Sequence, residues 1–157
     1  MRPFLDKAAP QAWAAAEAFS AAVGAEALAS GLSSGEAELI KVRASQINGC
    51  AYCLDLHSRQ ARQAGVSEQK LDLLPAWRET DIYDEREQAV LAIAEAATLL
   101  PLSEEASADL YGAQTLLGDD VFAAAEWVAI AINAFNRVSI LSRHPVRARG
   151  HVREERR

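Results

Sequence analysis

The sequence predicts an all-α fold. Alanine, the strongest helix former, supplies 33 of the 157 residues, whereas the β-branched residues Val, Ile and Thr together supply 19. Apolar residues also recur at the spacing of three and four that places them on one face of a helix, as in residues 84–100. A chain of this length buries about 68–70% of its unfolded surface, so one hydrophobic core is expected without disulfide or metal staples.

Start and stop signals divide the chain into about seven helices with short connections. Proline favours a first helical position, Ser-x-x-Glu forms a capping box, and glycine or proline follows a helix end. The expected helices span residues 10–28, 33–48, 49–65, 67–75, 84–100, 103–117 and 121–142.

In the first half of the chain, each expected helix has its own boundary signal. Pro10 stands at a first helical position. Ser33 and Glu36 match a capping box, and the helix that they start ends at the Asn48-Gly49 turn. The next helix begins at that turn and ends at Gly65, a residue suited to the left-handed conformation after a helix.

Further along the chain, Pro75 is expected to end the short helix that Ser67 caps, and Pro101 is expected to stop the helix over residues 84–100. The last helix, residues 121–142, is apolar on nearly all sides and is therefore expected at the centre of the fold or at a subunit interface. Its polar residues share one stripe, for which an internal ion-pair and hydrogen-bond set is favoured over a pocket lining. They are Glu126, Asn133 and Arg137.

Charge is unevenly distributed along the chain. The net charge is -6, but residues 143–157 carry +4 and residues 1–142 carry -10. An acidic body disfavours nucleic acid as a partner, because phosphates require a basic face. We expect one helical domain over residues 1–142 and a basic C-terminal arm over residues 143–157, either solvated or docked on the acidic body of a neighbouring subunit.

No membrane span is expected, because the longest uncharged run in the most apolar region, residues 127–136, is ten residues long and roughly 18 are needed. Residues 1–7 lack the apolar core of a secretory signal. The expected location is therefore the cytoplasm, where thiols stay reduced.

Both cysteines lie beside a histidine. Cys50, Cys53 and His57 are spaced by three and four residues, so they share one side of the predicted helix. Cysteines one turn apart lie close enough for a disulfide. His57 can take the Cys53 proton or stabilise its thiolate, and the helix N-terminus favours a thiolate at Cys50. Cys50 and Cys53 are therefore both candidates for an activated thiol.

Several kinds of site use such cysteines. A c-type haem site is excluded, because Leu54 stands where it needs a histidine, and no strand precedes the pair as in a thioredoxin-like fold. A zinc site would have only three ligands here, so Glu38, His144 or His151 would have to supply the fourth. A purely structural role for two buried cysteines is a further alternative, but it does not account for the histidine on the same helix face as both of them.

Redox thiol chemistry is the favoured interpretation. A thiolate attacks the O–O bond of a peroxide and becomes a sulfenic acid, and a second Cys converts this to a disulfide that an external dithiol reduces. Glu38 on the preceding helix can orient His57 and relay protons through it. The other nearby carboxylate, Glu36, is better explained by the capping box.

Glu38, Cys50, Cys53 and His57 follow the order E-x11-C-x-x-C-x3-H, and residues 43–57 read R-A-S-Q-I-N-G-C-A-Y-C-L-D-L-H. This segment resembles the AhpD-like alkylhydroperoxidases, within the wider carboxymuconolactone decarboxylase family. The resemblance implies an all-helical bundle, symmetric homo-oligomers (trimers or hexamers), and a cofactor-independent peroxidase with Glu38 and His57 as a proton relay. It also implies that Cys53 attacks the peroxide and Cys50 resolves the product, whereas the helix dipole alone favours Cys50.

One position departs from the family pattern: Tyr52 stands where the best-known members have a histidine. The sequence thus predicts a peroxidase for hydrogen peroxide or organic (alkyl) hydroperoxides, regenerated by a dithiol or protein reductant. The rival interpretation is a non-catalytic redox-sensing or zinc-binding oligomer that uses the same Cys and His residues. Lactone decarboxylation is disfavoured, because that branch of the family lacks the paired thiols.

Overall fold

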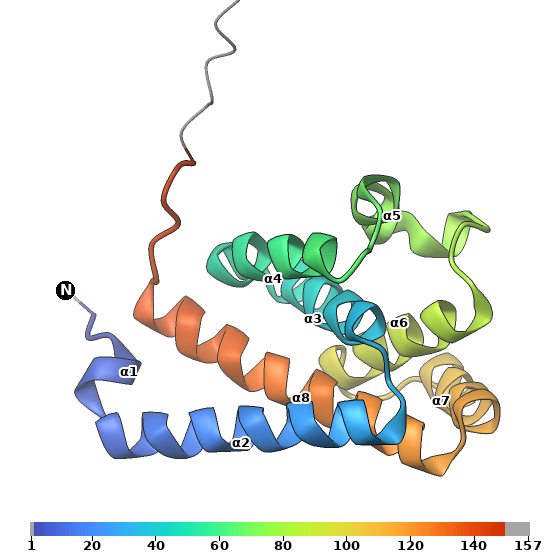
Figure 1. The fold of residues 1–157 in the computed structure, drawn as a ribbon, viewed down its shortest axis with the longest axis horizontal. Helices are drawn as coiled ribbons and strands as arrows, with labels where there is room; N and C mark the ends of the chain where they lie inside the picture. Colours follow the sequence, from blue (N-terminus) through green and yellow to red (C-terminus); the bar gives the residue numbers. More distant parts are fainter. Residues whose placement is uncertain (1, 150–157) are drawn as a thin grey trace, which may run out of the picture.

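The computed structural model describes residues 2–149, and no β-strand occurs in this range. The predicted all-α class is therefore confirmed. The helices, labelled in Figure 1, span Leu5–Ala8 (α1), Pro10–Ser30 (α2), Ser34–Asn48 (α3), Ala51–Gln63 (α4), Glu68–Leu73 (α5), Glu85–Thr98 (α6), Glu104–Leu117 (α7) and Asp119–Ser142 (α8), with a 3-10 helix at Leu74–Glu79 (η1).

Helix α8 is the centre of the bundle, as its apolar sequence predicts. It packs against α2, α3, α6 and α7, and in Figure 1 it runs between α2 on one side and α3 with α4 on the other. One core cluster joins these five packed helices and includes Ile40 and Ile93. A second cluster lies between α3, α4, α5, η1 and α6 and includes Leu39, Leu74 and Leu91.

The same helix is long and apolar enough, by length and composition alone, to cross a membrane, and 39% of its most apolar 18-residue window is buried inside the fold. The expectation of no membrane span rested on the short uncharged run between Glu126 and Arg137. Averaged over 18 residues, however, the mean hydropathy of α8 reaches 1.2 despite its charges.

Most helix boundaries follow their predicted signals. Ser33 Oγ accepts from the Glu36 amide at 3.1 Å, and the Ser33 amide donates to the Glu36 carboxylate at 2.8 Å, which completes the capping box. Gly65 has a φ of 89° just after α4, as predicted for a left-handed residue. The short helix that Ser67 caps ends at Leu73, just before Pro75, as predicted, and Pro75 itself stands in the first turn of η1. A first turn suits proline, because an N–H there has no partner within the helix.

The described part of the chain holds eight α-helices rather than about seven, since α1 was not predicted. Four residues are too few for an apolar period. The first backbone N–H of α1, at Leu5, donates to Ser142 Oγ at 3.0 Å and joins the N-terminal segment to the end of α8. Of the predicted arm, residues 143–149 are described, and residues 150–157 lie outside the described residues.

Candidate active site

The turn between α3 and α4 positions the two cysteines. Gly49 ends α3 in the left-handed conformation, with a φ of 67°, which glycine adopts without the steric cost of a Cβ. Cys50 follows as the N-cap of α4, and its Sγ accepts a hydrogen bond from the Cys53 amide at 3.3 Å. Cys53 therefore lies one turn into α4, directly above its cap.

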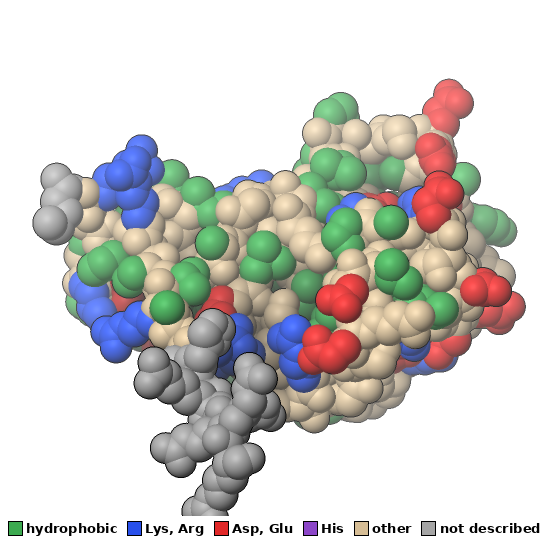
Figure 2. Space-filling model, turned by 90° about the horizontal axis from the view of Figure 1, so that it is seen from above, with side chains coloured by type: hydrophobic (Ala, Val, Ile, Leu, Met, Phe, Trp, Pro, Cys, Tyr) green, Lys and Arg blue, Asp and Glu red, His purple; other side chains and the backbone are tan. Residues whose placement is uncertain are grey.

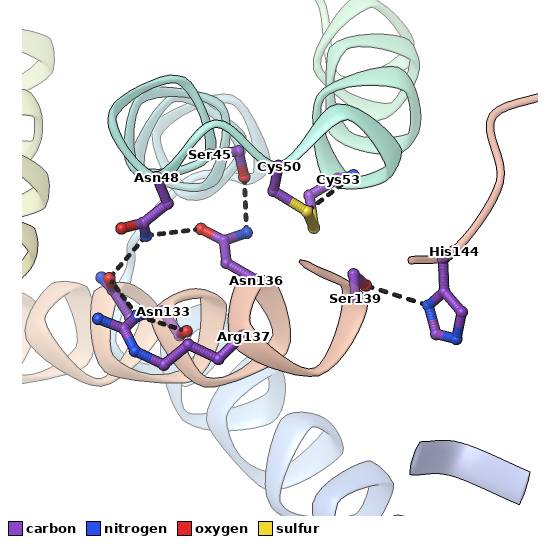
Figure 3. The surroundings of a disulfide bond; sticks show 9 residues. All are labelled: Ser45, Asn48, Cys50, Cys53, Asn133, Asn136, Arg137, Ser139 and His144. Carbon is purple, nitrogen blue, oxygen red and sulfur yellow. Dashed lines mark hydrogen bonds between the residues drawn. A yellow bond between two sulfur atoms is a disulfide. The ribbon is translucent and has the colours of Figure 1, made fainter. Parts of the chain in front are cut away.

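Cys50 and Cys53 form a disulfide, with Cα atoms 5.3 Å apart, within the distance that a disulfide spans. The two residues are buried, with exposed fractions of 1% and 3%. In Figure 3 the disulfide faces α8 near Asn136 and Ser139. The structure thus represents the oxidised protein.

One turn after Cys53, a carboxylate from α3 holds His57. Nδ1 of His57 lies 2.9 Å from Glu38 Oε2, and Glu38 Oε1 accepts from Lys41 Nζ at 2.7 Å. An ionised carboxylate only accepts hydrogen bonds, so this contact assigns a proton to Nδ1 and leaves Nε2 as the nitrogen that can accept one. Burial alone would raise the pKa of Glu38, but the hydrogen bond from His57 and the charge of Lys41 outweigh it, and the pKa is lowered.

A cavity of about 960 Å³ adjoins this group, a volume near the upper end of small-molecule sites. Glu38, Cys53 and His57 are among its lining residues, whereas Cys50 is not. Helices α2 and α8 contribute a largely apolar wall, which includes Trp13, Val23, Val128, Ile132 and Phe135. Of the two cysteines, Cys53 is therefore the one that a molecule in the cavity meets.

An amide network next to the disulfide ties α3 to α8 (Figure 3). Asn48 Nδ2 donates to Oδ1 of Asn133 and of Asn136, each at 2.9 Å. Asn136 Nδ2 in turn donates to Ser45 Oγ at 3.0 Å, and Arg137 donates to the Asn133 carbonyl oxygen at 2.8 Å. These contacts hold the end of α3, and with it the cysteine turn, against the central helix.

The predicted polar stripe on α8 is therefore confirmed only in part. Asn133 and Arg137 bond to each other, whereas Glu126 has no hydrogen-bond or ion-pair partner among residues 2–149, and burial raises its pKa. Sequence reasoning missed Asn48 and Asn136 as partners, because their side chains meet only when α3 packs on α8.

Sequence reasoning also missed where His144 lies. Its ring follows α8 and contacts the rings of Tyr52 and Phe4, with centroids 5.3 and 5.4 Å apart. Its Nε2 lies 3.2 Å from Asp6 Oδ1, and its Nδ1 lies 3.3 Å from Ser139 Oγ. His144 lines the same cavity as Cys53. Asp6 and His144 are 138 positions apart in sequence, so no local pattern signals their contact.

The zinc alternative requires both cysteines as free thiolates, whereas this structure holds them in a disulfide. Within residues 2–149, no three His, Cys, Asp or Glu side chains are grouped so that they could hold a metal ion. Of the residues considered as a fourth ligand, Glu38 bonds to His57, and His144 contacts Asp6 and Ser139. The third, His151, lies outside the described residues.

Comparisons with known proteins agree with this fold and motif. The model of the carboxymuconolactone decarboxylase family matches residues 9–96, more than half of the chain, and the protein therefore belongs to that family. Its fold is AhpD-like: it is similar to a crystal structure from Agrobacterium tumefaciens, with a TM-score of 0.80 and 34% identity, covering 93% of this chain and 99% of the other. That relative is described as a protein of unknown function for which the antioxidant-defence role of AhpD is suggested.

A curated relative adds similarity at the sequence level. The chain is 39% identical over 104 residues to the uncharacterized protein YdfG of Bacillus subtilis (strain 168). This match covers 66% of the present chain and 70% of YdfG.

Proposed function

We propose that the protein is a thiol peroxidase that reduces hydrogen peroxide or organic hydroperoxides through Cys53 and Cys50. One observation carries the proposal: Cys53, His57 and Glu38 line a single cavity, and the disulfide partner Cys50 stands outside its lining. Family membership supports the same class of reaction, since antioxidant defence is suggested for a structural relative.

In the first step, Nε2 of His57 accepts the Cys53 proton, and Glu38 stabilises the resulting imidazolium through Nδ1. The thiolate attacks one oxygen of the hydroperoxide, so that an S–O bond forms and the O–O bond breaks. The leaving alkoxide takes the proton back from His57 and departs as an alcohol, or as water when the substrate is hydrogen peroxide. Cys53 is left as a sulfenic acid.

In the second step, the Cys50 thiol attacks the sulfur of that sulfenic acid. An S–S bond forms, the S–O bond breaks, and the hydroxide leaves with the Cys50 proton as water. An external dithiol then reduces the disulfide by exchange and is itself oxidised to a disulfide. We place this cycle in the cytoplasm, where such reductants are available.

Peroxide consumption by the reduced protein with excess dithiothreitol tests the proposal. We expect Cys53→Ser to be inactive, and His57→Ala to lower kcat/KM by roughly 10²–10⁴-fold, the usual contribution of an acid–base group. Once the dithiothreitol is removed, Cys50→Ser treated with peroxide should accumulate a sulfenic acid that dimedone labels, whereas Cys53→Ser should not. An active Cys53→Ser with an inactive Cys50→Ser would reverse the thiol roles. If the wild type consumes no peroxide, the proposal of a peroxidase is refuted, and the interpretation as a non-catalytic redox-sensing protein remains.

We also propose that the protein assembles as a trimer or hexamer. The supporting feature is a single apolar face on α8, where Trp127, Ile130 and Leu141 are exposed by 51%, 48% and 54% and lie within about 60° of one another around the helix. An exposed apolar patch of this kind is typical of an interface. Light scattering should give three or six times the chain mass of 16.9 kDa; the mass of one chain contradicts the proposal.

A further inference from the structure

The cavity beside Cys53 has two chemically distinct parts. Between α2 and α8 its lining is apolar or small and extends as far as Leu28 and Leu32 at the end of α2. Beside α4 and the first residues of the C-terminal arm, its lining is charged. The cations there are Lys41, Arg59, Arg147 and Arg149.

Cations exceed carboxylates around the charged part. Arg59 and Arg149 both pair with one carboxylate, that of Asp55, and the hydrogen bond from Arg149 lowers the pKa of Asp55, so this pairing leaves one positive charge in excess. Arg147 has no carboxylate within ion-pair distance among residues 2–149 and adds another, whereas Asp6, which lines the cavity beside His144, offsets one, so that the net excess is one positive charge. Glu38, by contrast, is matched by Lys41.

This local excess of positive charge contrasts with the rest of the molecule. The chain has 16 Lys and Arg against 22 Asp and Glu, whereas the cavity is lined by four of the former and three of the latter. In the face shown in Figure 2, Lys and Arg gather toward the side that carries α1 and the end of α8, and Asp and Glu toward the other side. The charged part of the cavity is therefore more favourable to an anion than the acidic molecule as a whole.

The reactive thiol lies next to both parts. Cys53 and His57 belong to the same two turns of α4 as Asp55 and Arg59, and all four residues line the cavity. A ligand with an anionic group at the arginines and an alkyl chain along α2 and α8 therefore passes Cys53.

We propose that the cavity binds a single alkyl chain with an anionic head group, a carboxylate or a phosphate, the head near Arg147 and Arg149 and the chain between α2 and α8. If the proposed peroxidase activity holds, on which this assignment of a substrate class rests, the preferred substrates are hydroperoxides of such amphipathic molecules.

Binding of unreactive probes to the oxidised protein tests the site without any peroxidase activity. Calorimetry should show that dodecanoate binds saturably, and that dodecanol and butyrate, which each lack one of the two features, bind about tenfold more weakly or worse. Dodecyl phosphate distinguishes the two head groups: tighter binding than dodecanoate assigns a phosphate, and weaker binding a carboxylate. No binding of either anion, or equal binding of dodecanol, overturns the proposal.

Substitutions in the charged part of the cavity test where the head group of dodecanoate binds. The double variant Arg147→Gln/Arg149→Gln should weaken dodecanoate binding by about tenfold, the effect of losing one charge-assisted contact. Arg62→Gln is the matched control, since Arg62 is an exposed α4 arginine outside the cavity that pairs with Glu68. Equal binding by the double variant and the control overturns the assignment of the head group.

Two helical glycines provide a matched pair for the apolar part. A Cβ added at Gly24 of α2 or at Gly112 of α7 meets no atom within 4 Å, and only Gly24 lines the cavity. Gly24→Leu should therefore abolish dodecanoate binding, and Gly112→Leu should leave it unchanged. If a segment of a second copy of the chain occupied the cavity instead, the wild type would not bind dodecanoate, and Gly24→Leu would change the mass of the assembly. These two results together overturn the proposal.

Turnover separates this inference from the proposed function. The Gly24→Leu variant should reduce a fatty-acid hydroperoxide about tenfold more slowly than the wild type, whereas Gly112→Leu, outside the cavity lining, should reduce it at the wild-type rate. If the wild type binds dodecanoate but reduces no peroxide, the binding site stands and the proposed function fails. If it reduces peroxides but neither anion binds, the function stands and this inference fails.

Discussion

Cys50 and Cys53 are chemically identical but occupy different positions. Cys50 caps α4, where its sulfur accepts a backbone hydrogen bond. Cys53 lies one turn further and shares the cavity lining with His57 and Glu38. A helix N-terminus stabilises a thiolate, which favours Cys50 as the attacking residue, but attack also requires access. Access favours Cys53, and the resemblance to the AhpD-like enzymes implies the same role.

Glu38→Gln tests the orienting role of this carboxylate. The amide keeps the shape of the side chain but removes the charge that stabilises protonated His57. Because the pKa of Glu38 is lowered, it is ionised at neutral pH in the wild type. We expect peroxide kcat/KM to fall by about ten- to a hundredfold, the range found when a carboxylate that orients a metal-binding histidine is removed.

The measurement is kcat/KM from pH 5 to 9 with the thermal midpoint recorded alongside. Glu104→Gln, an exposed position on α7, serves as the control. An unchanged rate and pH profile in Glu38→Gln would remove Glu38 from the mechanism.

The junction of α3 and α4 depends on one glycine and on contacts with α8. Gly49 supplies the left-handed turn, and Asn48 and Asn136 bind the end of α3 to the central helix. Each feature satisfies a local requirement of the chain: a positive φ, or partners for buried amides. Together they determine where α4 starts, and therefore which side of α4 faces the cavity.

Gly49→Ala should destabilise the fold by about 1 kcal/mol, because an alanine Cβ disfavours a positive φ. Gly112→Ala in α7 is the matched control, and at that helical position the same change should stabilise by about 0.5–1 kcal/mol. Urea unfolding of both variants measures the difference. Equal shifts would contradict the role of the positive φ at Gly49.

Asn136→Leu should cost about 1–3 kcal/mol of unfolding free energy, since it removes a hydrogen-bond partner from the buried Ser45 hydroxyl and one of two partners from the half-buried Asn48 amide. Chemical denaturation, with exposed Gln114→Leu as the control, measures this cost. An unchanged midpoint in Asn136→Leu would mean that the amide network does not stabilise the contact between α3 and α8.

Several carboxylates that join separate helices depend on being ionised. Glu95 of α6 accepts hydrogen bonds from Arg43 of α3 and from Trp77 and Arg78 of η1, at 2.8–3.1 Å. Burial raises the pKa of Glu95, but these hydrogen bonds outweigh it and lower the pKa below its ordinary value of 4.5. The pKa of Glu36, paired with Arg86, is lowered in the same way.

The whole molecule should therefore lose stability in acid. A carboxylate whose pKa is lower in the folded state binds protons more readily when unfolded, so its stabilising contribution is complete above pH 4.5 and is lost as pH falls through the folded pKa. The thermal midpoint should fall steeply below about pH 4.5. Glu95→Gln should be less stable at pH 7 and lose less on acidification. A parallel pH dependence in the two proteins would contradict this account.

The all-α class, most helix boundaries and the shared side of Cys50, Cys53 and His57 were predictable, because each depends on spacing within a few turns of one helix. Helix geometry converts such spacing directly into position. The same local reasoning found that Pro75 ends α5 but not that it also starts η1, since a proline that ends one helix and a proline that starts the next carry the same signal.

Contacts between distant segments depended on how the helices pack. Glu38 was a candidate from its place on the preceding helix, but its bond to His57 required α3 and α4 to fold back at Gly49. The position of His144 beside Asp6, and the exclusion of Cys50 from the cavity lining, had no sequence signal. Short-range periodicity determines which residues share a helix face, whereas packing of α2, α3, α4 and α8 determines which of those faces meet around the cavity.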